Sequence, residues 1–257
     1  MFVNKKQADY FLFLKQFGKL KHMELEFQTA FLKKKLEAEG IFSFYCMKPE
    51  NFTFLPGQYV DITLPIDGRD ETYSFTLSST PEENELIFTT RQSGSLYKKA
   101  LFSIQKGQRL VMRGPLGGFV ISGTDKKNLI FLAGGIGITP FRSMMFNRLA
   151  SSGTYKIFLF ASFSKREDMV FYREFQEIME QNKNISIIWT LSNENNKEWE
   201  GEKGRINEEL LRKYIPNLAD CHFFVAGGND MVDDTVLFLQ KMGVENKYIK
   251  TDTFTGY

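Results

Sequence analysis

The sequence is poor in the residues that hold metals and cross-links. Its 257 residues include two cysteines, Cys46 and Cys221, and two histidines, His22 and His222. A four-cysteine zinc or iron–sulfur site and a three-histidine metal site are therefore both excluded on this chain. So few cysteines also exclude a scaffold held together by disulfides. We predict no metal site.

The sequence also has little excess of one charge sign over the other, and it has no long apolar run. Lys and Arg total 33 and Asp and Glu total 31, a net charge of +2, which argues against a large nucleic-acid-binding surface. The longest uncharged run, residues 128–141, contains three glycines and a proline and is too short to span a membrane. The apolar stretch near the N-terminus is too short for a signal peptide. We expect a cytoplasmic protein with no membrane insertion and no nucleic acid partner.

Hydrophobic periodicity divides the chain into three parts. Apolar residues in 1–22 share one helical face, which predicts an N-terminal helical extension. Residues 23–123 contain short strands separated by turns, with one short helix at 95–102, which predicts an antiparallel Greek-key β-barrel. Residues 124–257 alternate strands with helices, which predicts an α/β domain with a parallel sheet. The sequence therefore predicts two domains.

The strongest local motif is a glycine-rich loop that follows the predicted strand at 128–133 and opens a helix. Glycines let the backbone approach a pyrophosphate, and the N-terminus of a helix favours anions. Thr139 is expected to cap this helix, and Pro140 suits its first turn. A tight turn without a ligand is the alternative. The candidate nucleotide-binding residues of the loop are Gly134, Gly135, Gly137, Thr139 and Pro140.

The end of the next predicted strand, residues 156–161, carries polar and basic residues. In a dinucleotide fold an acidic residue at this place binds the ribose of NAD. Here Lys165 and Arg166 offer charge for a 2′-phosphate, and Ser162 and Ser164 offer hydroxyls, which favours NADPH over NADH. A solvated basic loop is the alternative. Helix caps are predicted further on at Asp168 and Asn207.

A second glycine loop follows the strand predicted at 222–226. Its candidate residues are Ala226, Gly227, Gly228 and Met231. Ligands bind at the carboxyl ends of strands in such sheets, so two loops at this edge favour a nucleotide crevice over two plain turns.

In the predicted barrel, the strand from Tyr73 to Ser79 is rich in hydroxyl groups, which suit either a solvated face or hydrogen bonds to a heterocycle.

Taken in order, these motifs resemble those of the ferredoxin–NADP+ reductase-like superfamily. The resemblance covers residues 23–257 and includes a flavin motif at Tyr73, Ser74, Phe75 and Thr76 and a Gly-Pro turn at 114–117. The two glycine loops and an aromatic C-terminus, Tyr257, complete it. The resemblance implies FAD in the barrel and NAD(P)H on the α/β domain, with FMN as the rarer flavin.

The resemblance also implies roles for the flavin-site residues. Phe75 would pack on the isoalloxazine ring, and Thr76 would hydrogen-bond near its N5. Tyr73 replaces the family arginine that meets the flavin phosphates. Three residues are alternatives for that charge: Arg69, Arg91 and Lys98. The family's pyrophosphate-binding helix start corresponds to Ser95, Leu96, Tyr97 and Lys98.

On the coenzyme side, Thr139 would lie close to both flavin and nicotinamide. Ala226 replaces a cysteine that many relatives place beside the nicotinamide, and Gly228 replaces a proline. Tyr257 would cover the flavin face and move to admit the nicotinamide. Asp252 is a nearby acid by analogy with the tails of relatives. These carry-overs make Thr76, Asp252 and Tyr257 the catalytic candidates.

The implied function is hydride transfer from NAD(P)H, with NADPH favoured, to bound FAD. Electrons then pass to a separate acceptor, either ferredoxin or another carrier protein, or a small molecule such as a free flavin, a quinone or dioxygen. One alternative is a flavin-binding subunit that docks an electron-transfer partner and has little or no reductase activity. A second alternative is a relic of the fold that binds neither nucleotide.

Overall fold

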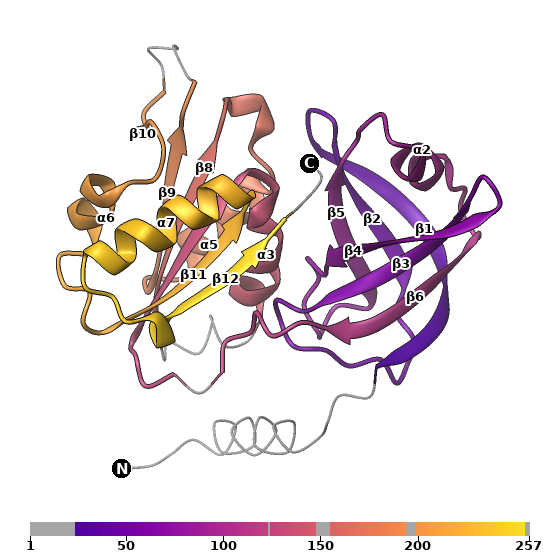
Figure 1. The fold of residues 1–257 in the computed structure, drawn as a ribbon, viewed down its shortest axis with the longest axis horizontal. Coiled ribbons are helices and arrows are strands. Elements are labelled where there is room, and N and C mark those ends of the chain that lie inside the picture. Colours follow the sequence, from indigo (N-terminus) through magenta and orange to yellow (C-terminus); the bar gives the residue numbers. More distant parts are fainter. Residues whose placement is uncertain (1–23, 123, 148–154, 194–198, 255–257) are drawn as a thin grey trace.

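The computed structural model describes residues 24–122, 124–147, 155–193 and 199–254. Two six-stranded sheets, one antiparallel and one parallel, form two domains that lie side by side (Figure 1). The predicted helix at 1–22 and the C-terminal Tyr257 lie outside the described residues. Among the helices that are described, none is long and apolar enough to cross a membrane.

The first domain is the predicted antiparallel barrel. Its strands are β1 (Leu25–Ala38), β2 (Ile41–Met47), β3 (Tyr59–Ile66), β4 (Arg69–Thr76), β5 (Glu85–Arg91) and β6 (Arg109–Leu116). Neighbouring strands in the order β4-β3-β6-β1-β2-β5 pair antiparallel, and a bridge between Leu77 and Phe88 joins the two outer strands. Aromatic and β-branched side chains of these strands fill the interior, as such residues do on half-buried sheets. Helix α2 (Leu96–Ser103) packs on β3 and begins at its Ser95 cap.

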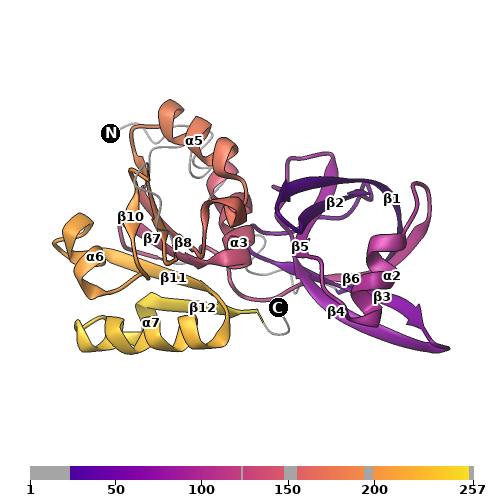
Figure 2. The same ribbon diagram turned by 90° about the horizontal axis from the view of Figure 1, so that it is seen from above.

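The second domain is the predicted parallel sheet. Its strands are β7 (Asn128–Gly134), β8 (Lys156–Phe163), β9 (Ile185–Leu191), β10 (Glu202–Lys203), β11 (Cys221–Gly227) and β12 (Ile249–Thr253), in the order β10-β9-β8-β7-β11-β12. The helices are α3 (Thr139–Phe146), α5 (Tyr172–Gln181), α6 (Glu208–Tyr214) and α7 (Asn229–Lys241), with short 3-10 turns at η1 (Gly135–Ile138), η2 (Arg166–Asp168) and η3 (Asn246–Tyr248). Figure 2 shows α3 and α5 on one face of the sheet and α6 and α7 on the other. Because helices cover both faces, the inner strand β11 is buried along its whole length.

Three local predictions differ from the structure. Thr139 is the first residue of α3, and Ile138 occupies the cap position without a side-chain bond, because η1 runs directly into the helix. Asp168 ends η2 and does not cap α5, which begins only at Tyr172. The short strand β10 has no signal in the sequence, since two residues carry no periodicity. The cap at Asn207 and the proline in the first turn of α3 are confirmed.

The two domains meet through a buried arginine. Arg142 of α3 donates to the Ser78 carbonyl of the barrel (2.8 Å) and to the Glu174 carboxylate of α5 (2.8 Å). It also holds Glu83 of the barrel through two bonds of 3.2 Å. We refer to Arg142, Ser78, Glu83 and Glu174 as the interdomain clamp. Since three partners share one guanidinium, the clamp fixes α3 against the segment that follows β4.

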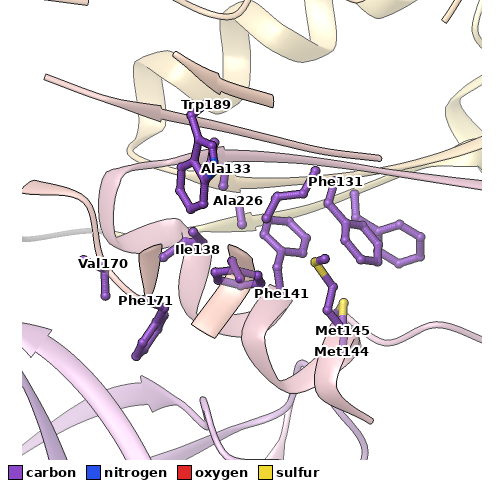
Figure 3. Close-up of a cluster of buried hydrophobic side chains, with 14 of the residues drawn as sticks. Phe131, Ala133, Ile138, Phe141, Met144, Met145, Val170, Phe171, Trp189 and Ala226 are labelled. Carbon is purple, nitrogen blue, oxygen red and sulfur yellow. The ribbon is translucent and has the colours of Figure 1, made fainter. Parts of the chain in front are cut away.

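Aromatic packing supports the same contact. Phe119, in the connection between the domains, lies 5.9 Å from Phe141 of α3 and 5.7 Å from Phe224 of β11, ring centre to ring centre. Figure 3 shows the core on this side of the sheet, in which Phe131 and Phe141 stack beside Ala133, Ile138 and Ala226. The glycine loop thus rests on a close-packed core.

Arg142→Met tests the interdomain clamp. We expect the variant to lower the free energy of unfolding by about 3 kcal/mol, because it leaves two carboxylates and a carbonyl without their common donor. Arg212→Met is the matched control, since Arg212 pairs only on the surface of α6 with Glu208, and its change should stay within about 0.5 kcal/mol. Urea unfolding measures both. Equal, small losses in the two variants would contradict the role given to Arg142.

Candidate active site between the two domains

Three residues that the sequence singles out come together where the two domains meet. Thr76 is the last residue of β4 in the barrel, and its side chain lies close enough to Asp252 of β12 to lower the pKa of that carboxyl group. Asp252 pairs in register with Ala226 of β11. Figures 1 and 2 both show β12 running toward the barrel, which brings the acid to the flavin strand. A polar pair therefore spans the domain boundary beside the second glycine loop.

Burial raises the pKa of Asp252 from 3.8 to about 6, while the hydrogen bond with Thr76 acts in the opposite direction. Burial has this effect because the charged form loses its hydration. A carboxyl group that titrates at about 6 changes charge close to neutral pH. It is therefore suited to electrostatic work or to holding a proton at this place.

The two glycine loops approach each other too closely for side chains. A Cβ on Gly137 would lie 2.2 Å from the Ala226 carbonyl oxygen, and one on Gly227 would lie 3.3 Å from the Cα of Gly134. Gly135 has a φ of +54°, which glycine adopts without strain. The loops thus form one cradle at the carboxyl edge of the sheet, at the N-terminus of α3.

Thr139 offers a hydrogen-bonding group in this cradle. Its hydroxyl oxygen is buried and has no hydrogen-bond partner among the residues that the structure describes. Buried polar groups usually have partners, so an orphaned hydroxyl at a coenzyme loop fits a polar group of a bound nucleotide. The glycine cradle and Thr139 together fit NAD(P)H.

On the flavin strand, the accessible aromatic ring is Tyr73. Its exposed fraction is 43%, and its ring stacks on Tyr97 with centres 4.2 Å apart. Phe75 is only 3% exposed and packs against Phe88 and Tyr97 inside the barrel. The contact of Phe75 with the isoalloxazine stays a prediction. Ser74 donates to Asp61 (2.6 Å), which also accepts from Arg113 (2.7 Å).

The start of α2 has the features of an anion site. The Ser95 side chain accepts from the Lys98 amide (3.2 Å), and Leu96 beside it is exposed. The Tyr97 hydroxyl donates to the Ile62 carbonyl (2.8 Å), which anchors the helix on β3. Lys98 is buried and donates to the Thr90 hydroxyl, and burial lowers its pKa from 10.5 to about 8. An amino group and a helix N-terminus together fit the FAD pyrophosphate.

The basic residues after β8 are separated in space. Lys165 forms a salt bridge of 2.8 Å with Glu39, which lies in the turn between β1 and β2 of the barrel. The charge of Lys165 is therefore paired across the two domains. Arg166 lies at a cavity of about 400 Å³ that Trp189 and Trp199 also line. Ser162 is the next-to-last residue of β8 and is half-buried, and Ser164 lies beyond the strand and is exposed. Of the predicted 2′-phosphate ligands, Arg166 is the better placed cation.

Sequence reasoning missed two residues that shape the site. Asp61 of β3 holds Ser74, and Thr90 of β5 holds Lys98. Both residues lie in segments whose hydrophobic pattern predicts a strand. That pattern does not indicate which side chain each residue will contact. Their partners come from other strands or from a helix, which no local pattern indicates.

Comparisons with known proteins match each domain separately. The model of the oxidoreductase FAD-binding domain matches residues 35–121, and that of the oxidoreductase NAD-binding domain matches residues 131–236. A subunit of the Na(+)-translocating NADH-quinone reductase from Idiomarina loihiensis is 29% identical over 184 residues, which are 69% of this chain and 44% of that protein. The glycine betaine monooxygenase reductase subunit of Chromohalobacter salexigens is 25% identical over 222 residues, 83% of this chain and 59% of that protein. The chain thus spans about half the length of the curated relatives it matches.

Solved structures share the whole fold. The cytochrome P450 reductase of Amycolatopsis has a TM-score of 0.82 at 20% identity, over 93% of this chain and 72% of that one. A ferredoxin NADP+ reductase from Neisseria gonorrhoeae, with bound FAD and NADP, has a TM-score of 0.79 at 19% identity, over 89% of this chain and 98% of that one. Both domain models, the order of the domains and the fold agree. The chain is therefore a member of the ferredoxin–NADP+ reductase-like superfamily, with an FAD-binding barrel followed by an NAD-binding domain.

Proposed function

We propose that the protein transfers a hydride from NADPH to bound FAD and passes the electrons to a separate acceptor. The observation that carries the proposal is the approach of Thr76, on the flavin strand, to Asp252, on the coenzyme sheet. It lies beside Ala226 of the second glycine loop, where the nicotinamide is expected. A cytoplasmic location also stays a proposal from the sequence.

FAD, when bound, supplies the redox chemistry, and the residues of this chain position and stabilise the reactants. The glycine cradle binds the coenzyme pyrophosphate at the start of α3. Thr139 offers its free hydroxyl to the nicotinamide end. Asp252, when ionised, stabilises the positive charge that develops on the nicotinamide as it loses hydride. Thr76 holds that carboxylate in place, and Tyr257 is proposed to cover the flavin until the coenzyme arrives.

The preference for NADPH rests on Arg166. Its guanidinium carries no acidic partner within salt-bridge distance among the described residues, unlike that of Arg91, which pairs with Asp168 (3.3 Å). Trp189 and Trp199 line the same cavity as Arg166 and offer flat surfaces for a base. Ser162 and Ser164 offer hydroxyls at the end of β8.

We propose that the acceptor is a separate molecule, because these 257 residues contain too few cysteines for an iron–sulfur centre. Among the relatives, one is named as a subunit of a quinone reductase and one as the reductase subunit of a monooxygenase. We propose a carrier protein such as ferredoxin as the first choice, with a quinone or another small molecule as the second.

A flavin-binding docking subunit is the second candidate function. The replacement of the family arginine by Tyr73 and of the family cysteine by Ala226 favours it. Both changes fall on positions that contact the cofactors in relatives, and neither disrupts the cradle or the Thr76–Asp252 pair.

An anaerobic titration with NADPH, followed at the flavin absorbance bands, tests the proposed reductase. We expect reduction at low NADPH and a weaker response to NADH, because the hydride donor and FAD meet at a preformed site. Dithionite, added afterwards, is the control that the flavin can be reduced. Flavin that dithionite reduces and NADPH does not would replace the reductase by the docking subunit.

Arg166→Ala tests the coenzyme preference. We expect the dissociation constant for NADPH to rise about tenfold, the loss of one charge-assisted phosphate contact, with that for NADH unchanged. Lys156→Ala is the matched control, since Lys156 is exposed at the opposite end of the same strand. Stopped-flow reduction at varied coenzyme concentration measures both constants. An equal rise for NADPH and NADH would remove Arg166 from the phosphate site.

The pH dependence of flavin reduction tests Asp252. Because its pKa is about 6, the group is ionised above that pH, and the rate constant should rise through an inflection near pH 6. Asp252→Asn should abolish the inflection and lower the rate constant about tenfold at alkaline pH. Asp234→Asn, an exposed change on α7, is the control and should keep the wild-type profile. If Asp252→Asn kept the inflection near pH 6, the inflection would belong to another titrating group.

A further inference from the structure

The structure separates the three residues that could replace the charge of the missing family arginine. Arg69 is the first residue of β4 and faces Ile66 across the hairpin, at the far end of the strand from Thr76. At about 3.3 Å per residue, the strand places it about 13 Å from Tyr73, the position of the family arginine. Arg91 pairs with Asp168 of the other domain (3.3 Å). Neither is placed to meet the FAD phosphates.

Lys98 lies where the replaced arginine would act. It follows Tyr97, whose ring stacks on Tyr73, the residue at the arginine position. Its side chain is 4% exposed, donates to the Thr90 hydroxyl, and holds its ammonium 4.9 Å from the centre of the Phe75 ring. Its own amide is bonded to the Ser95 cap (3.2 Å), so the ammonium and the start of α2 belong to one local unit.

We propose that Lys98 supplies the positive charge that binds the FAD pyrophosphate, so that this charge has moved from β4 to α2. The proposal rests on the proposed flavin function. Burying an ammonium costs free energy, and a pyrophosphate at the adjacent helix N-terminus is a negative group that offsets this cost. The lowered pKa of Lys98, about 8, agrees with an ammonium that gains stability when an anion arrives.

In this arrangement Tyr73 has a structural part. Stacked rings with centres 4.2 Å apart hold β4 against α2, next to the residue that carries the charge. A tyrosine at this position therefore orients the helix start instead of contacting the phosphates itself. The same contact explains why the site tolerates the loss of the arginine.

Lys98→Met tests the proposal, with Lys99→Met as the matched control. Lys99 is the next residue of α2 and is exposed. Apo-protein is titrated with FAD and with riboflavin, which lacks the phosphates, and quenching of flavin fluorescence gives the dissociation constants. We expect Lys98→Met to weaken FAD binding at least about tenfold and to leave riboflavin binding unchanged. Lys99→Met should bind both like the wild type.

A double variant makes the test independent of folding damage. Tyr73→Arg restores the family arginine, so Tyr73→Arg with Lys98→Met should recover FAD binding. Wild-type FAD affinity in Lys98→Met, or equal losses for FAD and riboflavin with no recovery in the double variant, would overturn the proposal. A Lys98→Met variant that binds oxidised FAD like the wild type but binds reduced FAD more weakly would have a lower midpoint potential. This result would also overturn the proposal, because Lys98 would then act on the isoalloxazine ring and not on the pyrophosphate. A wild-type protein that binds no FAD would instead overturn the proposed function itself.

Discussion

Arg142 donates hydrogen bonds to groups of both domains at once, and the active site depends on the relative placement that these bonds hold. Arg142 lies one helical turn beyond Thr139, and its acceptor Ser78 follows Thr76 closely in the chain. The clamp therefore joins a residue close to the coenzyme loop to a residue close to the flavin strand. Because removing one partner of a buried charge pair costs about 3–5 kcal/mol, separation of the domains is opposed where the site needs it.

Close packing adds a second constraint to this charge contact. A Cβ on Gly57 would lie 1.9 Å from the carbonyl oxygen of Phe119, and Phe119 itself packs on Phe141 and Phe224. The connection between the domains is thus packed tightly between the barrel and the sheet. Within that frame Asp252 is half-buried and still reaches Thr76, so the raised pKa of Asp252 follows from how the domains dock.

Elements that carry their own signal were predictable from the sequence. The apolar strand predicted at 128–133 is β7, and the cap at Asn207 lies where it was predicted, since periodicity and capping are local. The cap at Asp168 was wrong, because Asp168 instead accepts from Arg91 across the domain boundary. The predicted cap at Thr139 was also wrong, because η1 directly precedes α3 and makes Thr139 the first residue of that helix. The sequence brought Thr76 and Asp252 together through the family resemblance, whereas the burial of Phe75 and Lys98 depends on contacts between distant strands and a helix.

The two departures from the family pattern have different physical consequences. Ala226 is fully buried in the core on the α3 side of the sheet, and the lack of a Cβ on Gly137 leaves room for the Ala226 carbonyl where the two loops meet. Without a cysteine at this position, we propose that the Thr139 hydroxyl and the Thr76–Asp252 pair position the nicotinamide. The change at Tyr73 instead removes the positive charge of the family arginine, and in our proposal another cation replaces it. Loss of the family cysteine at Ala226 therefore needs no replacement. Loss of the family arginine at Tyr73 leaves the flavin phosphates without a cation, and Lys98 is the residue that we propose in its place.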